Sequence, residues 1–185
     1  MIVLAIDPGT EKLGISLLKD DGILGMWYVS LTPKDIGARY KGIFRVIQTI
    51  LDEIREKPDY YAIETPFFSR NMATTIKLGT TRGVIMGCIF RKDIQAEIVD
   101  VNPVEVRNNL GLKKNADKKE CHRIAKLILG NSQVGNEIHE DVLDSLGIGL
   151  AALTKIKQMK LDESAKIRTK GSRGKRRVIR KTSCR

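Results

Sequence analysis

The chain has 185 residues, of which 42% are hydrophobic, and these values are typical of one folded domain with a tail. The formal net charge is +11, but residues 1–154 contain 20 basic and 20 acidic residues, so the whole excess lies in the last 31 residues. A uniformly basic packaging protein is thereby excluded. We expect a neutral globular domain over residues 1–159 and a flexible basic tail over residues 160–185.

The sequence also argues against a membrane or secreted protein. No apolar stretch reaches the roughly 20 residues that a membrane-spanning helix needs. The N-terminal apolar run lacks a preceding basic segment and ends early at Asp7, unlike a signal peptide. Cys88, Cys121 and Cys184 are odd in number and widely spaced, which favours ordinary thiols over a disulfide framework or zinc site. We expect a cytoplasmic protein with no membrane partner, although an organelle or nucleus stays open.

The first third of the chain predicts an antiparallel meander followed by a helix. Residues 2–6 form an apolar run that ends at Asp7-Pro8-Gly9-Thr10, the pattern of a buried strand followed by a turn. Residues 14–19 and 23–31 continue as strands on either side of an Asp-Asp-Gly turn. The apolar spacing then changes to that of a helix over residues 39–57.

The rest of the chain predicts two more strands and four helices. The strands are expected at residues 60–64 and 97–101. The helices are expected at residues 71–90, 103–110, 117–129 and 138–159. This order indicates an α/β domain with a mixed sheet and helices on both faces.

Three glycines stand four residues apart in the helix predicted for residues 71–90: Gly79, Gly83 and Gly87. A glycine in a helix interior costs about 1 kcal/mol relative to alanine, so some gain has to offset it. A stripe without side chains allows another backbone to approach closely, either within the fold or across a dimer.

Four carboxylates fall at the ends of predicted elements. Asp7 and Glu64 each follow an apolar strand, so they emerge together if the two strands are neighbours. Asp141 and Asp144 are three residues apart near the start of the last helix and share one face. Carboxylates so clustered repel one another unless a cation neutralises them, and oxygen ligands suit Mg²⁺ or Mn²⁺. The pattern therefore predicts a metal site.

Each of these acids also has an ordinary structural explanation. Asp-Pro-Gly is a common turn sequence, Glu64 could simply end its strand, and Asp141 could complement the helix N-terminus. His139 and Glu140, just before Asp141, are alternative ligands at the helix. The prediction of a metal site depends on the four acids taken jointly.

The sequence resembles the RuvC-type Holliday junction resolvases, within the ribonuclease H-like superfamily. The matching segments are residues 6–10 with Gly14, residues 58–64, residues 77–84 and residues 141–146. They occur in the family's order between Met1 and about Leu153. The resemblance implies a ribonuclease H-like fold, with a mixed five-stranded sheet flanked by helices on both faces and followed here by the basic C-terminal tail.

The same resemblance implies a crossover junction endodeoxyribonuclease. Such an enzyme resolves four-way DNA junctions in recombination, repair or replication by symmetric nicks that leave 5′-phosphate and 3′-hydroxyl ends. An acidic tetrad would hold two Mg²⁺ ions, with Mn²⁺ able to substitute: Asp7, Glu64, Asp141 and Asp144. Lys118 would stabilise charge on the phosphate. A homodimer is also implied, because a two-fold symmetric junction needs two active sites.

Further residues match DNA-contacting positions of the family. Phe67 matches an aromatic that wedges at the junction crossover, and its neighbour Phe68 could take that role, although both could simply pack. Arg107 falls where the family places a basic residue near the scissile phosphate. The other basic candidates are Arg70, Lys113, Lys114 and Lys119. A solvated charged face would explain the three lysines equally well.

Other functions compete with this interpretation. Ribonuclease H-like nucleases also cut RNA or RNA–DNA hybrids, and small resolvase-like nucleases process ribosomal RNA. Sugar kinases and actin-like ATPases share an Asp-x-Gly-Thr opening, but they need a second nucleotide-binding half. The stiff Pro66 before Phe67, the pair His139-Glu140 and the basic tail depart from the bacterial pattern, which puts the cut-site preference in doubt. The tail could bind the arms of the junction or serve as a nuclear localisation signal.

Overall fold

The computed structural model describes residues 1–20, 22–65, 71–130 and 138–179, with side chains described up to residue 166. The chain divides into two compact units, residues 1–153 and 154–185. Among the helices of the described ranges, none is both long and apolar enough to cross a membrane. The first unit contains the sheet and all four acids singled out above.

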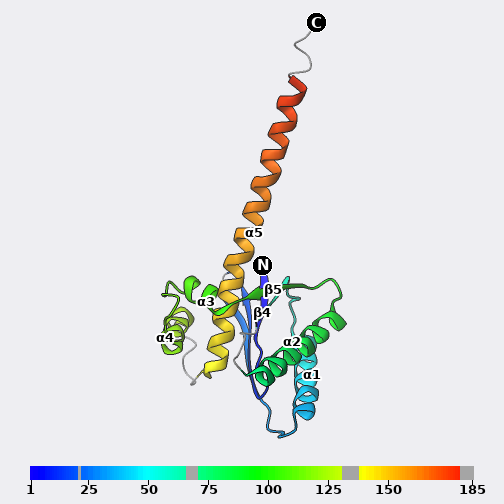
Figure 1. Ribbon diagram of the computed structural model, residues 1–185, viewed down its shortest axis with the longest axis vertical. Helices are drawn as coiled ribbons and strands as arrows, with labels where there is room; N and C mark the ends of the chain where they lie inside the picture. Colours follow the sequence, from blue (N-terminus) through cyan, green and yellow to red (C-terminus); the bar gives the residue numbers. More distant parts are fainter. Residues whose placement is uncertain (21, 66–70, 131–137, 180–185) are drawn as a thin grey trace. The chain divides into compact units, whose positions relative to one another are not determined.

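A mixed five-stranded sheet forms the centre of the first unit, as predicted (Figure 1). Its strands are β1 (Ile2–Asp7), β2 (Lys12–Lys19), β3 (Gly22–Ser30), β4 (Tyr60–Glu64) and β5 (Glu97–Val101). They lie side by side in the order β3-β2-β1-β4-β5. The first three strands are antiparallel, whereas β4 runs parallel to both β1 and β5.

The central position of β1 follows from its composition. Val3, Leu4, Ala5 and Ile6 are each at most 1% exposed, so the strand is covered on both faces, as an uninterrupted apolar run predicts. Because β1 and β4 are parallel neighbours, their carboxyl ends lie at the same edge of the sheet. This arrangement brings Asp7 and Glu64 to that edge and confirms the prediction made from the two apolar runs.

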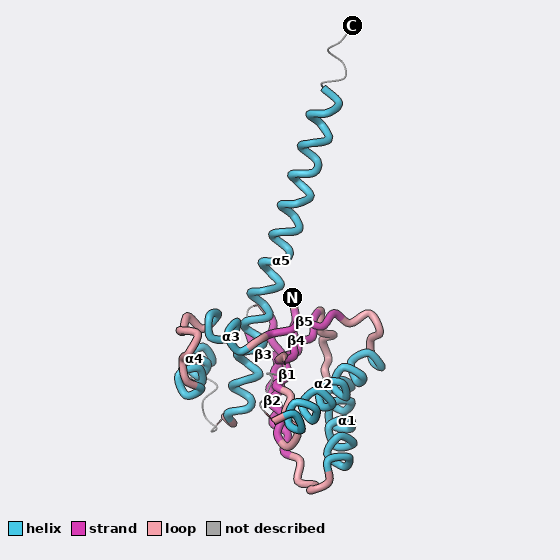
Figure 2. The backbone as a smooth tube through the Cα atoms, in the orientation of Figure 1, coloured by secondary structure: helices cyan, strands magenta, loops and turns pink. Residues whose placement is uncertain are grey.

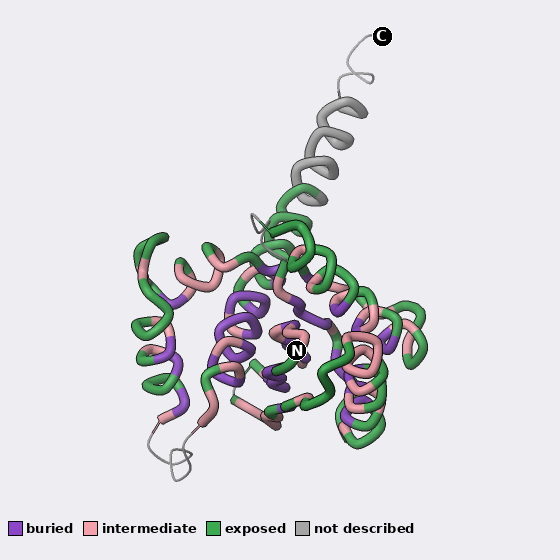
Figure 3. The backbone as a smooth tube through the Cα atoms, turned by 60° about the horizontal axis from the view of Figure 1, so that its bottom comes forward, coloured by how far each residue is buried: buried purple, intermediate pink, exposed green. Residues whose placement is uncertain are grey.

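Helices cover both faces of the sheet, also as predicted (Figure 2). They are α1 (Ile36–Glu53), α2 (Met72–Lys92), α3 (Pro103–Asn109), α4 (Lys118–Leu129) and α5 (Glu140–Ile179). On one face α1 and α2 contribute Ile43, Ile47, Ile85 and Ile89 to the main apolar core. On the other face lie α3, α4 and the start of α5. The buried segments gather on the sheet and on the sides of the helices that face it (Figure 3).

The boundaries of the first and last helices differ most from the sequence pattern, and the first helix ends at Glu53 instead of near Lys57. The first helix begins three residues earlier, because the Asp35 carboxylate accepts a hydrogen bond from the Ala38 backbone and caps the helix at Ile36. The last helix does not end near Met159, as the apolar spacing predicted, but continues to Ile179. Residues 160–170 lack proline and glycine, and seven of the eleven are good helix formers: three lysines and one each of leucine, glutamate, alanine and arginine.

A glycine of β2 brings the last helix onto the sheet. Gly14 pairs with Asp7 in the β1–β2 ladder. A Cβ atom at Gly14 would lie only 1.7 Å from the carbonyl oxygen of Asp141. A residue without a side chain is therefore required for α5 to start at this point of the sheet. The same contact places Asp141 beside Asp7.

Candidate metal centre

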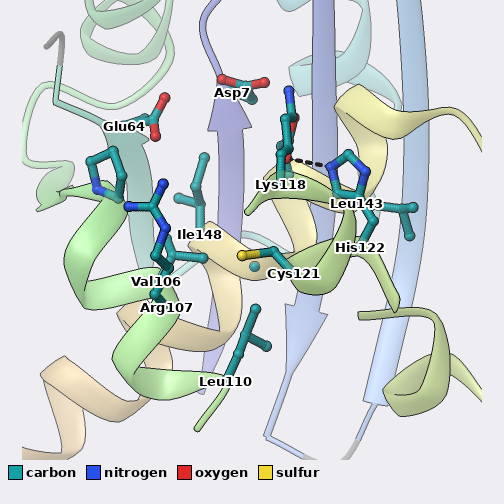
Figure 4. Close-up of a pocket in the computed structure, with 13 residues that line it drawn as sticks. Asp7, Glu64, Val106, Arg107, Leu110, Lys118, Cys121, His122, Leu143 and Ile148 are labelled. Carbon is teal, nitrogen blue, oxygen red and sulfur yellow. Dashed lines mark hydrogen bonds and ion pairs between the residues drawn. The ribbon is translucent and has the colours of Figure 1, made fainter. Parts of the chain in front are cut away.

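Three carboxylates converge at the edge of the sheet. Asp7 ends β1, while Asp141 and Asp144 come from the first two turns of α5, and one oxygen of each lies within 4.8 Å of the other two. Glu64 is outside this group of three, but it lines the same cavity as Asp7 and Asp144. Figure 4 shows Asp7 and Glu64 at the ends of the neighbouring strands β1 and β4. The expected proximity of the acids is thus observed most closely for three of the four.

Burial and mutual repulsion make it unfavourable for all the carboxylates of this cluster to be ionised at the same time. Burial, together with repulsion from Glu64 and Asp144, raises the pKa of Asp7 to about 8. Burial and the charge of Asp144 also raise the pKa of Glu64. Such a cluster has to bind protons or a cation at neutral pH. Since its donors are all carboxylate oxygens, it fits Mg²⁺ or Mn²⁺.

Lys118 supplies a positive charge at this edge. Its Nζ lies 2.6 Å from Oδ2 of Asp144. Burial alone would lower the pKa of Lys118, but the Asp144 carboxylate outweighs it, so the pKa is raised and the ammonium stays charged. The side chain remains 61% exposed, so it can also reach an anion outside the cluster.

A cavity of about 240 Å³ is lined by three of the acids, Asp7, Glu64 and Asp144, and by apolar residues that include Val106, Leu110, Leu143 and Ile148. Arg107 of α3 lines this cavity, and its Nε donates to the carbonyl oxygen of Ala116 at 3.0 Å. Figure 4 shows Arg107 on the side of Glu64 and Lys118 on the other side of Asp7. Two cationic side chains therefore flank the carboxylates, an arrangement suited to a phosphate that approaches a metal centre.

Two histidines hold carboxylates of the cluster. His122 is buried on α4, and its Nε2 lies 2.7 Å from Oδ1 of Asp144. His139 lies with Nδ1 2.8 Å from Oδ2 of Asp141, and its ring stacks on Tyr28. The sequence interpretation left His139 open as a ligand and missed His122. The signal for His122 was its position one helical turn after Lys118.

Arg82 of α2 ties the ends of two strands together. Its guanidinium donates to the backbone carbonyls of Ile63 and Glu64 at 3.3 and 3.2 Å and forms an ion pair with Asp100 on β5. These bonds fix the backbone that carries Glu64. The sequence pattern singled out Arg82 only as part of a motif and did not predict this role.

The predicted DNA-contacting residues divide into two groups. Phe67, Phe68 and Arg70 lie outside the described residues. Lys113 and Lys114, in the link between α3 and α4, and Lys119, in the first turn of α4, are all exposed. Their exposure leaves them accessible to a polyanion, but it does not distinguish a DNA contact from a solvated face.

Comparisons with known proteins agree with this architecture. A model of the family described as crossover junction endodeoxyribonuclease RuvC matches residues 3–152. The crossover junction endodeoxyribonuclease RuvC of Chlorobium phaeovibrioides is 32% identical over 159 residues, which cover 83% of this chain and 81% of that protein. Its counterpart from Carboxydothermus hydrogenoformans is 31% identical over 160 residues, which cover 84% and 98%.

A solved structure supports the fold. The structure of T. thermophilus RuvC in complex with Holliday junction substrate has a TM-score of 0.70 to this chain at 22% identity. The match covers 85% of this chain and 96% of that one. The ribonuclease H-like architecture predicted from the sequence is therefore confirmed.

Proposed function

The chain belongs to the RuvC family of crossover junction endodeoxyribonucleases, and we propose from this membership that it resolves four-way DNA junctions by metal-dependent hydrolysis. The observation that carries the proposal is the convergence of Asp7, Asp141 and Asp144, with Glu64 beside them, between the cationic Lys118 and Arg107. We place the enzyme in the cytoplasm, where it acts in recombination, repair or replication.

The acidic cluster would hold two Mg²⁺ ions, or Mn²⁺ in their place, through a tetrad of ligands: Asp7, Glu64, Asp141 and Asp144. Bound there, the ions would supply Lewis acidity to the phosphodiester and lower the pKa of the attacking water. Asp7 would be a central ligand of this tetrad, because one of its oxygens lies within 4.8 Å of oxygens of Asp141 and Asp144 and because the charge of Glu64 also acts on it. The products would carry 5′-phosphate and 3′-hydroxyl ends.

The cationic residues around the cavity would orient the DNA. Lys118 and Arg107 would bind the scissile phosphate, a proposal supported by their lining the same cavity as Asp7, Glu64 and Asp144. The remaining proposed DNA contacts are Phe67, Phe68, Arg70, Lys113, Lys114 and Lys119. Residues 160–185 would serve as a cationic accessory segment, because lysine and arginine contacts to phosphates add salt-dependent affinity.

A panel of substrates tests this function directly. With Mg²⁺ we expect paired, symmetric nicks in a four-way junction, whose ends a DNA ligase can reseal, and no cutting in EDTA. Linear DNA duplex, RNA–DNA hybrid and single-stranded RNA of the same sequence serve as controls. Faster cleavage of the hybrid or the RNA than of the junction would assign the chain to the other ribonuclease H-like nucleases instead.

We further propose that the enzyme acts as a homodimer through α2. Five exposed residues of this helix form a stripe opposite its buried side: Met72, Ile76, Gly79, Gly83 and Gly87. Met72 is 71% exposed, and a Cβ atom at any of the three glycines would meet nothing within 4 Å. An apolar surface with room for a second backbone suits a two-fold axis, and two sites are needed to cut a symmetric junction.

Substituting Gly83 by Arg tests this interface. We expect Gly83→Arg to be monomeric, because a bulky charge in the centre of the stripe prevents close helix packing. Light scattering after size exclusion should then give the mass of one chain, against two for the wild type. Ala73→Arg, an exposed position of α2 outside the stripe, should remain dimeric. A dimeric Gly83→Arg protein would exclude α2 as the interface.

A further inference from the structure

Both carboxylate oxygens of Asp144 are bound from one helix. Nε2 of His122 lies 2.7 Å from Oδ1, and Nζ of Lys118 lies 2.6 Å from Oδ2. The two partners are one turn apart on α4, so they approach the same carboxylate side by side. A dashed line in Figure 4 marks the contact that the His122 ring makes.

The two contacts differ in rigidity. The His122 side chain is 8% exposed, whereas that of Lys118 is 61% exposed. An exposed lysine is strongly hydrated and loses conformational entropy when it is held in one geometry, so its ion pair is easily exchanged. A buried imidazole is held by packing, and its hydrogen bond to a carboxylate is strengthened by the low local dielectric. His122 is therefore the partner that fixes the orientation of Asp144.

We propose that His122 is a positioning residue of the metal centre. Its Nε2–H donates to Oδ1 of Asp144 and leaves the second oxygen, Oδ2, to bind a cation together with Asp7 and Asp141. When a cation binds Oδ2, Lys118 leaves this oxygen and is then available to bind a phosphate. This inference rests on the metal-dependent function proposed above. The role given to His122 is to orient the Asp144 carboxylate, which is distinct from filling space in the core and from neutralising charge.

Two substitutions separate positioning from packing. His122→Leu fills the space without a donor, while the amide of His122→Gln can place an N–H where Nε2 stands. We expect His122→Leu to weaken Mn²⁺ binding to the full chain by about 10–100-fold, the usual effect of losing a partner that orients a metal ligand. His122→Gln should stay within a few-fold of the wild type. Isothermal titration calorimetry with MnCl₂ measures both.

Leu129→Ala is the matched control. Leu129 is buried on the same helix but lies outside the cavity, so its truncation should lower the melting temperature and leave Mn²⁺ affinity unchanged. Circular dichroism melting confirms that each protein is folded, and His122→Met replaces His122→Leu if the latter does not fold.

The outcomes distinguish this inference from the proposed function. Wild-type Mn²⁺ affinity in His122→Leu, or an equal loss in His122→Leu and His122→Gln, would overturn the positioning role. Asp144→Asn is titrated alongside. If it binds Mn²⁺ as tightly as the wild type, the metal centre itself is misassigned, and both the inference and the proposed mechanism fail. Loss in Asp144→Asn and His122→Leu, with retention in His122→Gln, supports both.

Discussion

We expect Asp7→Asn to abolish junction cleavage in Mg²⁺ and to leave junction binding intact. Asp7 interacts with all three other acids of the proposed tetrad, so its loss should affect the whole cluster. Loss of an outer partner of a metal ligand already costs about 10–100-fold, and loss of a ligand should exceed this. Binding persists because it depends on lysine and arginine contacts to phosphates. Cleavage of a labelled junction and gel retardation in EDTA measure the two properties.

The same variant has a pH-dependent effect on stability. The pKa of Asp7 is about 8 in the folded protein against 3.8 in the unfolded chain, so between these values the folded state retains a proton that the unfolded state has lost. This contribution is complete below pH 3.8 and is lost as the pH rises through about 8. The free energy of unfolding changes by about 1.4 kcal/mol per pH unit in this range. Between pH 6 and pH 9 it should therefore fall by roughly 2–3 kcal/mol more for the metal-free wild type than for Asp7→Asn.

Thermal unfolding in EDTA at pH 6 and pH 9 measures this difference, which corresponds to about 5–10 °C in Tm for a protein of this size. Asp52→Asn, which removes an exposed acid paired with Lys92, is the control and should match the wild type in both cleavage and pH dependence. Cleavage by Asp7→Asn at the wild-type rate would remove Asp7 from the metal centre. A parallel pH dependence of the two proteins would show that Asp7 is ionised throughout.

We expect Gly14→Ala to disrupt the metal centre without changing a carboxylate. The added Cβ would lie 1.7 Å from the carbonyl oxygen and 2.2 Å from the carbonyl carbon of Asp141. Because these atoms belong to the backbone, the start of α5 has to move away from the sheet by more than 1 Å. A displacement of about 1 Å in a catalytic group costs roughly 100-fold in rate, and overpacking costs about 1–3 kcal/mol in stability.

Junction cleavage, Mn²⁺ titration and thermal unfolding should therefore all be impaired in Gly14→Ala. The matched control is Gly22→Ala, at the start of β3 in the same antiparallel pair, where an added Cβ meets nothing within 4 Å. It should behave like the wild type in all three measurements. If Gly14→Ala retains wild-type cleavage and Mn²⁺ affinity, the contact between β2 and α5 does not position Asp141.

Three residues whose structural roles the sequence did not predict share one property: each role depends on a partner from another element. His122 looks like any polar residue on an amphipathic helix until α4 lies against α5. Arg82 forms its bonds with strands that are 18 and 19 residues away in the chain. Gly14 is required only because α5 starts over it. None of these contacts produces a periodic pattern in the local sequence.

The sequence by itself determined the five strands, the sites of the five helices and the positions of the acids at their ends. It could do so because the apolar spacing records which side of each element is buried, and this depends on local backbone geometry. The tertiary structure decided which side chains meet. It placed one oxygen each of Asp7, Asp141 and Asp144 within 4.8 Å of one another. It also put Glu64 in the cavity that Asp7 and Asp144 line, and it brought His122 into contact with Asp144. These contacts arise from the packing of distant elements, which a one-dimensional pattern does not encode.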